Sequence, residues 1–175
     1  QLLERLQLDS SLSNQALAEL VHVSPPTCLR RVKRLFDEGL IERVRKHLAE
    51  PFRKPFADYN RAALQAALAG WDGKAALILD AGCGVGHSTI QIARQYPDHW
   101  VIGVDQSAGR LNRRKPYPEA LLPKNMVFVR ADLVDFWRLL DEAGLRLARH
   151  YVLYPNPWPK IGHLGRRWHA HPVFP

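Results

Sequence analysis

A glycine-rich turn is the part of this sequence best suited to chemistry. The run DAGCGVG starts at Asp80, directly after the apolar stretch Leu77–Leu79. Because they lack side chains, Gly82, Gly84 and Gly86 let the backbone pass close to a ligand, and open α/β sheets bind ligands at the carboxyl ends of their strands. We therefore expect Asp80 and the three glycines to form part of a ligand-binding turn.

Two more aspartates end the strands expected next along the chain. Asp105 ends IGVD, where its carboxylate can accept both hydroxyls of a ribose, and Asp132 ends VRAD, where a polar group can meet the edge of an adenine. The dinucleotide fingerprint GxGxxG, counted from Gly82, requires Gly or Ala where this chain has His87. The residues predict a site for an adenosine-containing ligand that is not a nicotinamide dinucleotide. A nicotinamide-binding domain and a catalytically inactive fold are the alternatives.

A loop rich in proline, YPNPWPK, follows the fourth expected strand. Tyr154 and Trp158 offer flat faces for a nucleobase and Asn156 offers an amide, so we expect Asn156 and Trp158 to meet the second substrate. Three basic residues that suit phosphate contacts come after them, Lys160, Arg166 and Arg167. In the alternative interpretation, Trp158 and Trp168 belong to the core and the arginines are solvated.

Alternating strands and helices are expected to position these residues. The expected strands are AALILD, WVIGVD, MVFVRAD and HYVLYP, with helices over Ser88–Gln95 and Phe136–Leu145 and an irregular basic stretch before Lys124. A short helix, Ala62–Leu68, precedes them. This alternation predicts a parallel sheet with right-handed crossovers.

The first 47 residues instead predict helices joined by tight turns. Leucines near the start indicate a first helix, Ser13 caps a second, and a third opens at Ser24 and Pro25 and ends at Gly39. This spacing is typical of a helix-turn-helix.

The third helix carries four basic residues, Arg30, Arg31, Lys33 and Arg34. We expect them to lie on the faces away from Leu29, Val32 and Leu35, as a helix that enters the major groove of DNA requires. A solvated basic face on a core helix is the alternative.

Charge is distributed unevenly along the chain. The net charge is +8, of which residues 1–50 carry +1 and residues 51–175 carry +7. A basic balance favours a polyanionic partner, although a surface that only aids solubility has the same charge.

Cysteine and histidine spacing argues against disulfides and metal. Cys28 and Cys83 lie far apart, and His163, His169 and His171 lack the spacing of strong zinc sites. No apolar run is long enough to cross a bilayer, and the first residues lack the layout of a signal peptide. We expect a cytoplasmic protein with no metal and no membrane partner.

Two resemblances extend this interpretation. LDSSLSNQALAELVHVSPPTCLRRVKRLFDEGLI, from Leu8 to Ile41, resembles the DNA-binding domain of the Lrp/AsnC family of transcription regulators, which implies contact with duplex DNA. The ligand-binding αβ domain expected next in that family is absent, so effector sensing is not implied.

The second resemblance starts near His47. Asp80, the three glycines, Asp105 and Asp132 resemble the Rossmann-like class of S-adenosylmethionine-dependent methyltransferases. HLAEPFRKPFADYN, DAGCGVGHST and YPNPWPKIGHLGRRW resemble the bacterial tRNA (guanine-N7-)-methyltransferases, which implies S-adenosylmethionine as methyl donor and a guanine in the variable loop of tRNA as acceptor. Members commonly have Asp where this chain has Asn156. An Asn-Pro-aromatic loop also resembles enzymes that methylate exocyclic amino groups, so such a group is the alternative target.

We therefore expect an α/β fold: a partial Rossmann-like methyltransferase sheet preceded by a small all-α (winged) helix-turn-helix domain. The expected parts are residues 1–46, a junction and leading helix over 47–74, and the methyltransferase domain over 75–175. A complete fold of this class has seven strands, whereas four are expected here. The fourth strand would therefore form an unpaired apolar edge. A fragment, an artificial fusion and a natural two-domain protein remain open, as does the oligomeric state. The alternative function is a DNA-binding regulator with a vestigial methyltransferase module.

Overall fold

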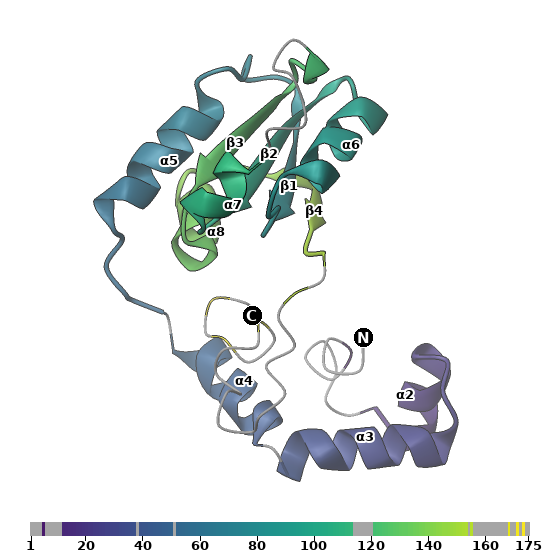
Figure 1. Cartoon of the computed structure of the whole chain (residues 1–175). Coiled ribbons are helices and arrows are strands. Elements are labelled where there is room, and N and C mark those ends of the chain that lie inside the picture. The colour runs from purple at the N-terminus through teal and green to yellow at the C-terminus, as the bar shows by residue number, and fades with distance from the viewer. Residues whose placement is uncertain are drawn as a thin grey trace. The chain divides into compact units, whose positions relative to one another are not determined.

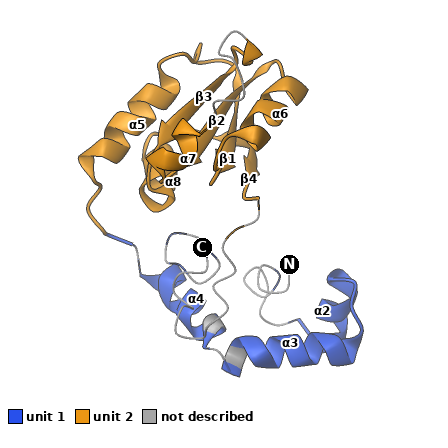
Figure 2. Ribbon diagram, viewed as in Figure 1, with its two compact units in different colours: residues 1–53, 156–175 blue, residues 54–155 orange. Residues whose placement is uncertain are grey.

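The structure is a computed structural model that describes residues 5, 12–37, 39–50, 52–113, 121–153, 155, 168, 171 and 173. The chain divides into two compact units, one of residues 1–53 with 156–175 and one of residues 54–155 (Figures 1 and 2). None of the described helices is long and apolar enough to cross a membrane.

The described regular structure of residues 12–50 in the first unit is helical, as predicted. Its helices are α2 (Asn14–Leu20), α3 (Pro25–Asp37) and α4 (Leu40–Ala49). Ser13 caps α2 because its side chain accepts a hydrogen bond from the Ala16 N–H at 3.2 Å. Of the helix predicted before α2, the structure describes Arg5 alone, which is helical. The described residues of this unit include no strand that could form a wing.

Helix α4 was not predicted, because the third expected helix ended at Gly39 and the next expected helix began at Ala62. Ile41 and Val44 are buried three residues apart, which is the spacing of one helix face, but Leu48 on the next turn is 58% exposed. The apolar stripe is therefore too short to stand out among the charged residues around it.

The second unit contains a four-stranded sheet with the order β3-β2-β1-β4 (Figure 1). The strands are β1 (Ala76–Ala81), β2 (His99–Asp105), β3 (Met126–Arg130) and β4 (Leu147–Tyr151). All three pairings are parallel, as predicted. Ala81 pairs with Val104 and Asp105 with Arg130, so the carboxyl ends of β1, β2 and β3 lie side by side.

Helices cover both faces of this sheet, as Figure 1 shows. The second unit contains α5 (Asp58–Leu68), α6 (His87–Gln95), α7 (Ala108–Asn112) and α8 (Leu133–Glu142). α5 and α8 pack with Leu77, Leu79 and Ile102 in the larger core cluster. α6 packs with Ile78 and Val101 on the opposite face, because alternate residues of a strand point to opposite sides.

The fourth strand differs from the prediction in position and in character. β4 is Leu147–Tyr151 (LARHY), whereas the predicted strand was HYVLYP. It is an edge strand in the described sheet, as expected, but Arg149 and His150 are exposed on it. The expectation of an apolar edge was therefore wrong. Charged and polar side chains make an edge strand less prone to aggregate.

Candidate functional site

The glycine turn lies between β1 and α6, at the carboxyl edge of the sheet. Gly82, Gly84 and Gly86 have φ values of +78°, +60° and +86°, a region that residues with side chains rarely adopt. The N–H groups of Gly82 and Cys83 donate to the Val104 carbonyl at 2.8 and 3.0 Å, which fastens the turn to β2.

Two of the three glycines border open space. A Cβ atom at Gly82 or Gly84 would meet no atom within 4 Å, whereas one at Gly86 would lie 2.5 Å from the Phe128 ring. The first two glycines therefore leave backbone accessible to a ligand, and the third allows β3 to pack closely against the turn.

Asp80 ties β1 to the first turn of α6. It is 1% exposed, and its Oδ2 accepts hydrogen bonds from Ser88 Oγ at 2.6 Å and Thr89 Oγ1 at 2.7 Å. A buried carboxylate needs such donors, because its removal from water is otherwise costly. These contacts give Asp80 a structural role in holding the turn.

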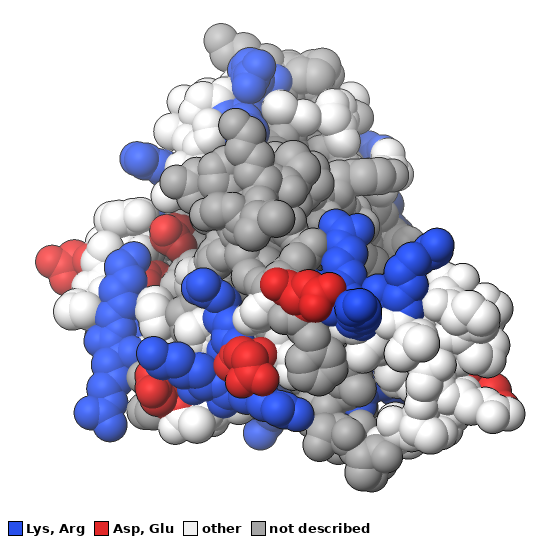
Figure 3. All heavy atoms as spheres, turned by 90° about the horizontal axis from the view of Figure 1, so that it is seen from below, with Lys and Arg blue, Asp and Glu red and all other residues white. Residues whose placement is uncertain are grey.

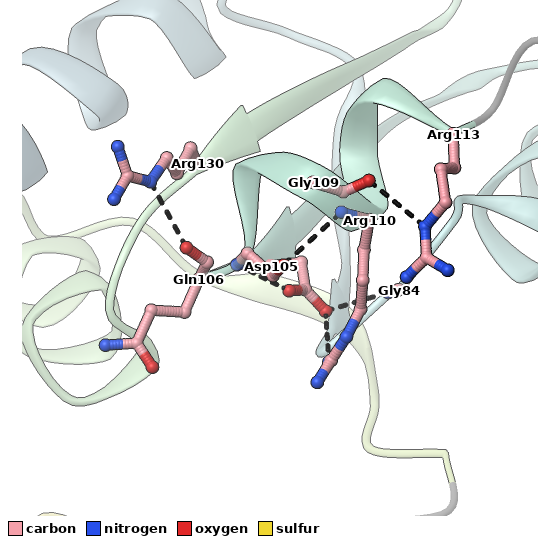
Figure 4. Close-up of polar contacts among 8 residues, drawn as sticks. Gly84, Asp105, Gln106, Gly109, Arg110, Arg113 and Arg130 are labelled. Atoms are coloured by element: carbon pink, nitrogen blue, oxygen red, sulfur yellow. Dashed lines mark hydrogen bonds and ion pairs between the residues drawn. The ribbon is translucent and has the colours of Figure 1, made fainter.

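Asp105 lies at the end of β2, next to the glycine turn (Figure 4). Its Oδ2 accepts from the Gly84 N–H at 3.0 Å and from Arg110 Nη1 at 3.2 Å, while its Oδ1 accepts from the Ser107 N–H at 2.7 Å. The side chain is 3% exposed, and that of Arg110 is 54% exposed. The structure thus brings Asp105 and Gly84 together as the sequence suggested, and it adds Arg110, which lies in a stretch expected to be irregular.

Asp132 caps α8, with its Oδ1 accepting from the Val134 N–H at 2.9 Å. Its own N–H donates to Asn60 Oδ1 at 2.9 Å, so α5 helps to position the end of β3. Asn60 is fully buried and also donates to Asp135 Oδ2 at 2.7 Å. Sequence reasoning missed Asn60, because a single amide in a helix gives no periodic signal.

Cys83 occupies the turn between two carboxylates. Burial, reinforced by the charges of Asp80 and Asp105, raises the pKa of its thiol to about 12. The side chain is 7% exposed, so it is a protonated packing group at neutral pH.

The residues expected to meet the second substrate lie outside the described residues. These are Asn156, Trp158, Lys160, Arg166 and Arg167. Trp168 is described, half-buried, with its ring centroid 6.0 Å from that of His171. Among the described residues, no three His, Cys, Asp or Glu side chains are grouped as metal ligands would be.

On α3 the four basic side chains, Arg30, Arg31, Lys33 and Arg34, are all exposed, as expected. Figure 3 shows Lys and Arg side chains next to Asp and Glu side chains among the described residues in its view. The expectation that Leu29 lies on the apolar face of this helix was wrong, because Leu29 is 58% exposed. Fully buried Cys28 packs with Leu17 and Ala18 in its place.

Comparisons with known proteins agree with this arrangement. Residues 1–42 match the family described as "Winged helix-turn-helix DNA-binding". Residues 74–173, more than half of the chain, match the family described as "Putative methyltransferase".

Several curated relatives are named tRNA (guanine-N(7)-)-methyltransferase. The relative from Mycobacterium avium (strain 104) is 35% identical over 100 residues, which are 56% of this chain and 38% of the relative. Those from Treponema pallidum (strain Nichols) and Neorickettsia sennetsu are 30% and 31% identical over 53% and 54% of this chain, and 37% and 42% of their own lengths. The chain thus spans about two-fifths of the length of these relatives.

The match over residues 74–173 covers the strands, the glycine turn, Asp105 and Asp132, which are the features on which the methyltransferase prediction rested. The chain therefore belongs to this methyltransferase family.

Proposed function

We propose that residues 54–155 contain the S-adenosylmethionine-binding site of a methyltransferase that acts on N7 of guanine in tRNA. The observation that carries the proposal is the open space beside Gly82 and Gly84, with the buried Asp105 carboxylate bonded to the Gly84 N–H. A nucleoside placed there would have backbone on one side and an acceptor for its ribose hydroxyls on the other.

The proposed methyl transfer requires little of this chain beyond holding the donor and the acceptor in position. S-adenosylmethionine, when bound, supplies a methyl group that an electron pair can attack directly. Guanine N7 carries a lone pair and no proton, so no strong general base is required. The task of Gly82, Gly84 and Asp105 is to hold the donor, and that of Asp132 is to meet the adenine edge, because orientation provides much of the rate in such displacements.

The acceptor side of the proposal comes from sequence and from the printed names of the relatives. We assign Asn156 and Trp158 to the base, and Lys160, Arg166 and Arg167 to phosphates. The net charge of +7 over residues 51–175 would attract a polyanion over a longer range.

Calorimetry with S-adenosylhomocysteine tests the donor site. Replacing Asp105 by Asn should weaken binding by about 10- to 150-fold, because hydrogen bonds to a charged group contribute about 1.5–3 kcal/mol. Asp98→Asn, at an exposed position before β2, is the matched control and should bind like the parent. Unchanged affinity of a folded Asp105→Asn protein would reject the ribose assignment.

Mass analysis of nucleosides from treated tRNA tests the acceptor. The full-length protein should produce 7-methylguanine, and Asn156→Asp should keep or raise that product if Asn156 takes the place of the family carboxylate. A methylated adenine, or no RNA product in a protein that binds S-adenosylhomocysteine, would reject the tRNA guanine assignment and keep the donor site.

Duplex DNA binding by α3 is a second candidate function, favoured by its four exposed basic side chains and by the winged helix-turn-helix match. Fluorescence anisotropy should show affinity that falls steeply with salt, with a log–log slope reduced by about 1 for each phosphate contact removed. The quadruple alanine variant of Arg30, Arg31, Lys33 and Arg34 should lose this binding. A triple alanine variant on α4, at Arg43, Arg45 and Lys46, is the control. DNA binding without S-adenosylhomocysteine binding would favour a regulator with a vestigial methyltransferase module.

A further inference from the structure

We propose that Arg110 is a displaceable occupant of the position on Asp105 that the donor's ribose hydroxyls must take, and that it thereby sets the affinity of the nucleoside site. The inference rests on the proposed donor site and assigns a function to a residue outside the glycine turn. Figure 4 shows the contacts on which it depends.

Asp105 already receives three hydrogen bonds. Its donors are the backbone N–H groups of Gly84 and Ser107 and the guanidinium of Arg110, at 3.0, 2.7 and 3.2 Å. A carboxylate offers about four acceptor positions, and a ribose that binds through both hydroxyls needs two of them. At least one of the three present donors must therefore leave.

The two backbone donors are held by the fold. Gly84 lies in the turn that Gly82 and Cys83 fasten to the Val104 carbonyl. The Ser107 N–H precedes α7, and Ser107 Oγ caps that helix by accepting from the Arg110 N–H at 3.3 Å. Moving either donor would disrupt a turn or a helix start.

Arg110 can leave without any change in the backbone. Its side chain is 54% exposed, and rotation about its side-chain bonds would carry the guanidinium into water. The Asp105 side chain that it contacts is only 3% exposed, so displacement of Arg110 is the route that opens the carboxylate.

The strength of this competition follows from exposure. An ion pair with a partner so accessible to water contributes little, which makes Arg110 a weak competitor rather than a lock. Its removal should tighten nucleoside binding by up to about fivefold. Salt screens the pair, so the advantage of the variant should shrink as ionic strength rises.

Calorimetry with S-adenosylhomocysteine on the parent, Arg110→Gln and Arg113→Gln proteins tests the inference at about 50 mM and about 500 mM salt. Arg113 follows the same helix, and its Nε donates to the Gly109 carbonyl at 3.2 Å, so Arg113→Gln removes an equal charge from a side chain bonded elsewhere. We expect tighter binding by Arg110→Gln at low salt, a smaller gap at high salt, and parental affinity for Arg113→Gln.

Each other outcome is decisive. Equal or weaker binding by folded Arg110→Gln overturns the inference and leaves the donor site intact. In an Asp105→Asn background, Arg110→Gln should have no further effect, and a persistent effect would show that Arg110 acts through another group. Failure of all three proteins to bind S-adenosylhomocysteine overturns the donor site and the inference together.

Discussion

At the scale of single residues, the glycine turn combines a side that borders open space with a tightly packed side. Cys83 belongs to the packed side, together with the buried carboxylates of Asp80 and Asp105. Because burial and these charges raise the pKa of its thiol to about 12, the folded protein keeps a proton that the unfolded chain would release at a lower pH.

Stability should therefore fall as pH rises from about 9 toward about 12, by up to about 1.4 kcal/mol per pH unit from this group. The sign follows because the unfolded state ionises first and binds fewer protons in that window. Urea unfolding at pH 8 and pH 10.5 should show a smaller loss for Cys83→Ala than for the parent. Equal losses would show that Cys83 ionises normally in the folded protein.

Gly86 and Gly82 differ in packing although both have positive φ. Replacement by Ala should strain the backbone at either position by about 1–2 kcal/mol. Only at Gly86 does the new Cβ fall 2.5 Å from the Phe128 ring, which should add about 1–3 kcal/mol. Urea unfolding of the two variants measures this difference, and similar losses for both would mean that Phe128 moves aside freely.

The sequence indicates which residues could do chemistry better than it indicates what they contact. Asp80, Asp105 and the glycines stand out because they end or follow apolar strands. β2 ends at Asp105 as expected, and β1 ends at Ala81, one residue later than expected. The hydroxyls of Ser88 and Thr89 on Asp80, and the guanidinium on Asp105, depend on side-chain packing that no strand pattern encodes. Arg110 was missed because a five-residue helix is too short to show a period.

At the scale of elements, a buried polar network joins α5 to α8. Asp135 is fully buried, and its Oδ2 accepts from Asn60 Nδ2 at 2.7 Å and from the Ala57 N–H at 3.1 Å. Arg138 Nη1 lies 3.6 Å from Asp135 Oδ1 and also donates to the Lys54 carbonyl at 2.7 Å. The network fixes the start of α5 and, through Asn60, the backbone at Asp132.

Asn60→Ala should destabilise the second unit by about 3 kcal/mol, because it leaves a buried carboxylate and the Asp132 N–H each short of a partner. Gln65→Ala, at an exposed position on the same helix, should stay within about 0.5 kcal/mol of the parent. Urea unfolding measures both. A cost below about 1 kcal/mol for Asn60→Ala would show that water replaces the amide.

Element types were easier to predict than their limits. α5 begins at Asp58, four residues before the predicted Ala62. Its first turn is held by Asp135, which accepts hydrogen bonds from the Ala57 N–H and from Asn60, and an apolar stripe does not mark it. α8 ends at Glu142 instead of Leu145, since the chain turns at Gly144 with a φ of +66°. Tertiary contacts and one positive φ, rather than periodicity, decide these limits.

At the scale of the whole molecule, each unit has a core of its own. Leu17, Ala18 and Cys28 form the cluster of the first unit, and the sheet with α5, α6 and α8 forms those of the second. The residues proposed to bind DNA belong to the first unit, and those proposed to bind the donor belong to the second. Residues 52–57, which connect them, form no helix or strand.

We therefore expect the two proposed binding activities to be independent. The quadruple alanine variant on α3 should lose DNA binding and keep its affinity for S-adenosylhomocysteine within about twofold, and Asp105→Asn should show the reverse. If the two sites are independent, a saturating amount of either ligand should leave the affinity for the other unchanged. Because linkage makes any coupling reciprocal, the two titrations should agree. Calorimetry and fluorescence anisotropy on the same preparations measure both directions. A shift of about fivefold or more in either titration would mean that about 1 kcal/mol passes between the units, as a regulator that senses a nucleoside requires.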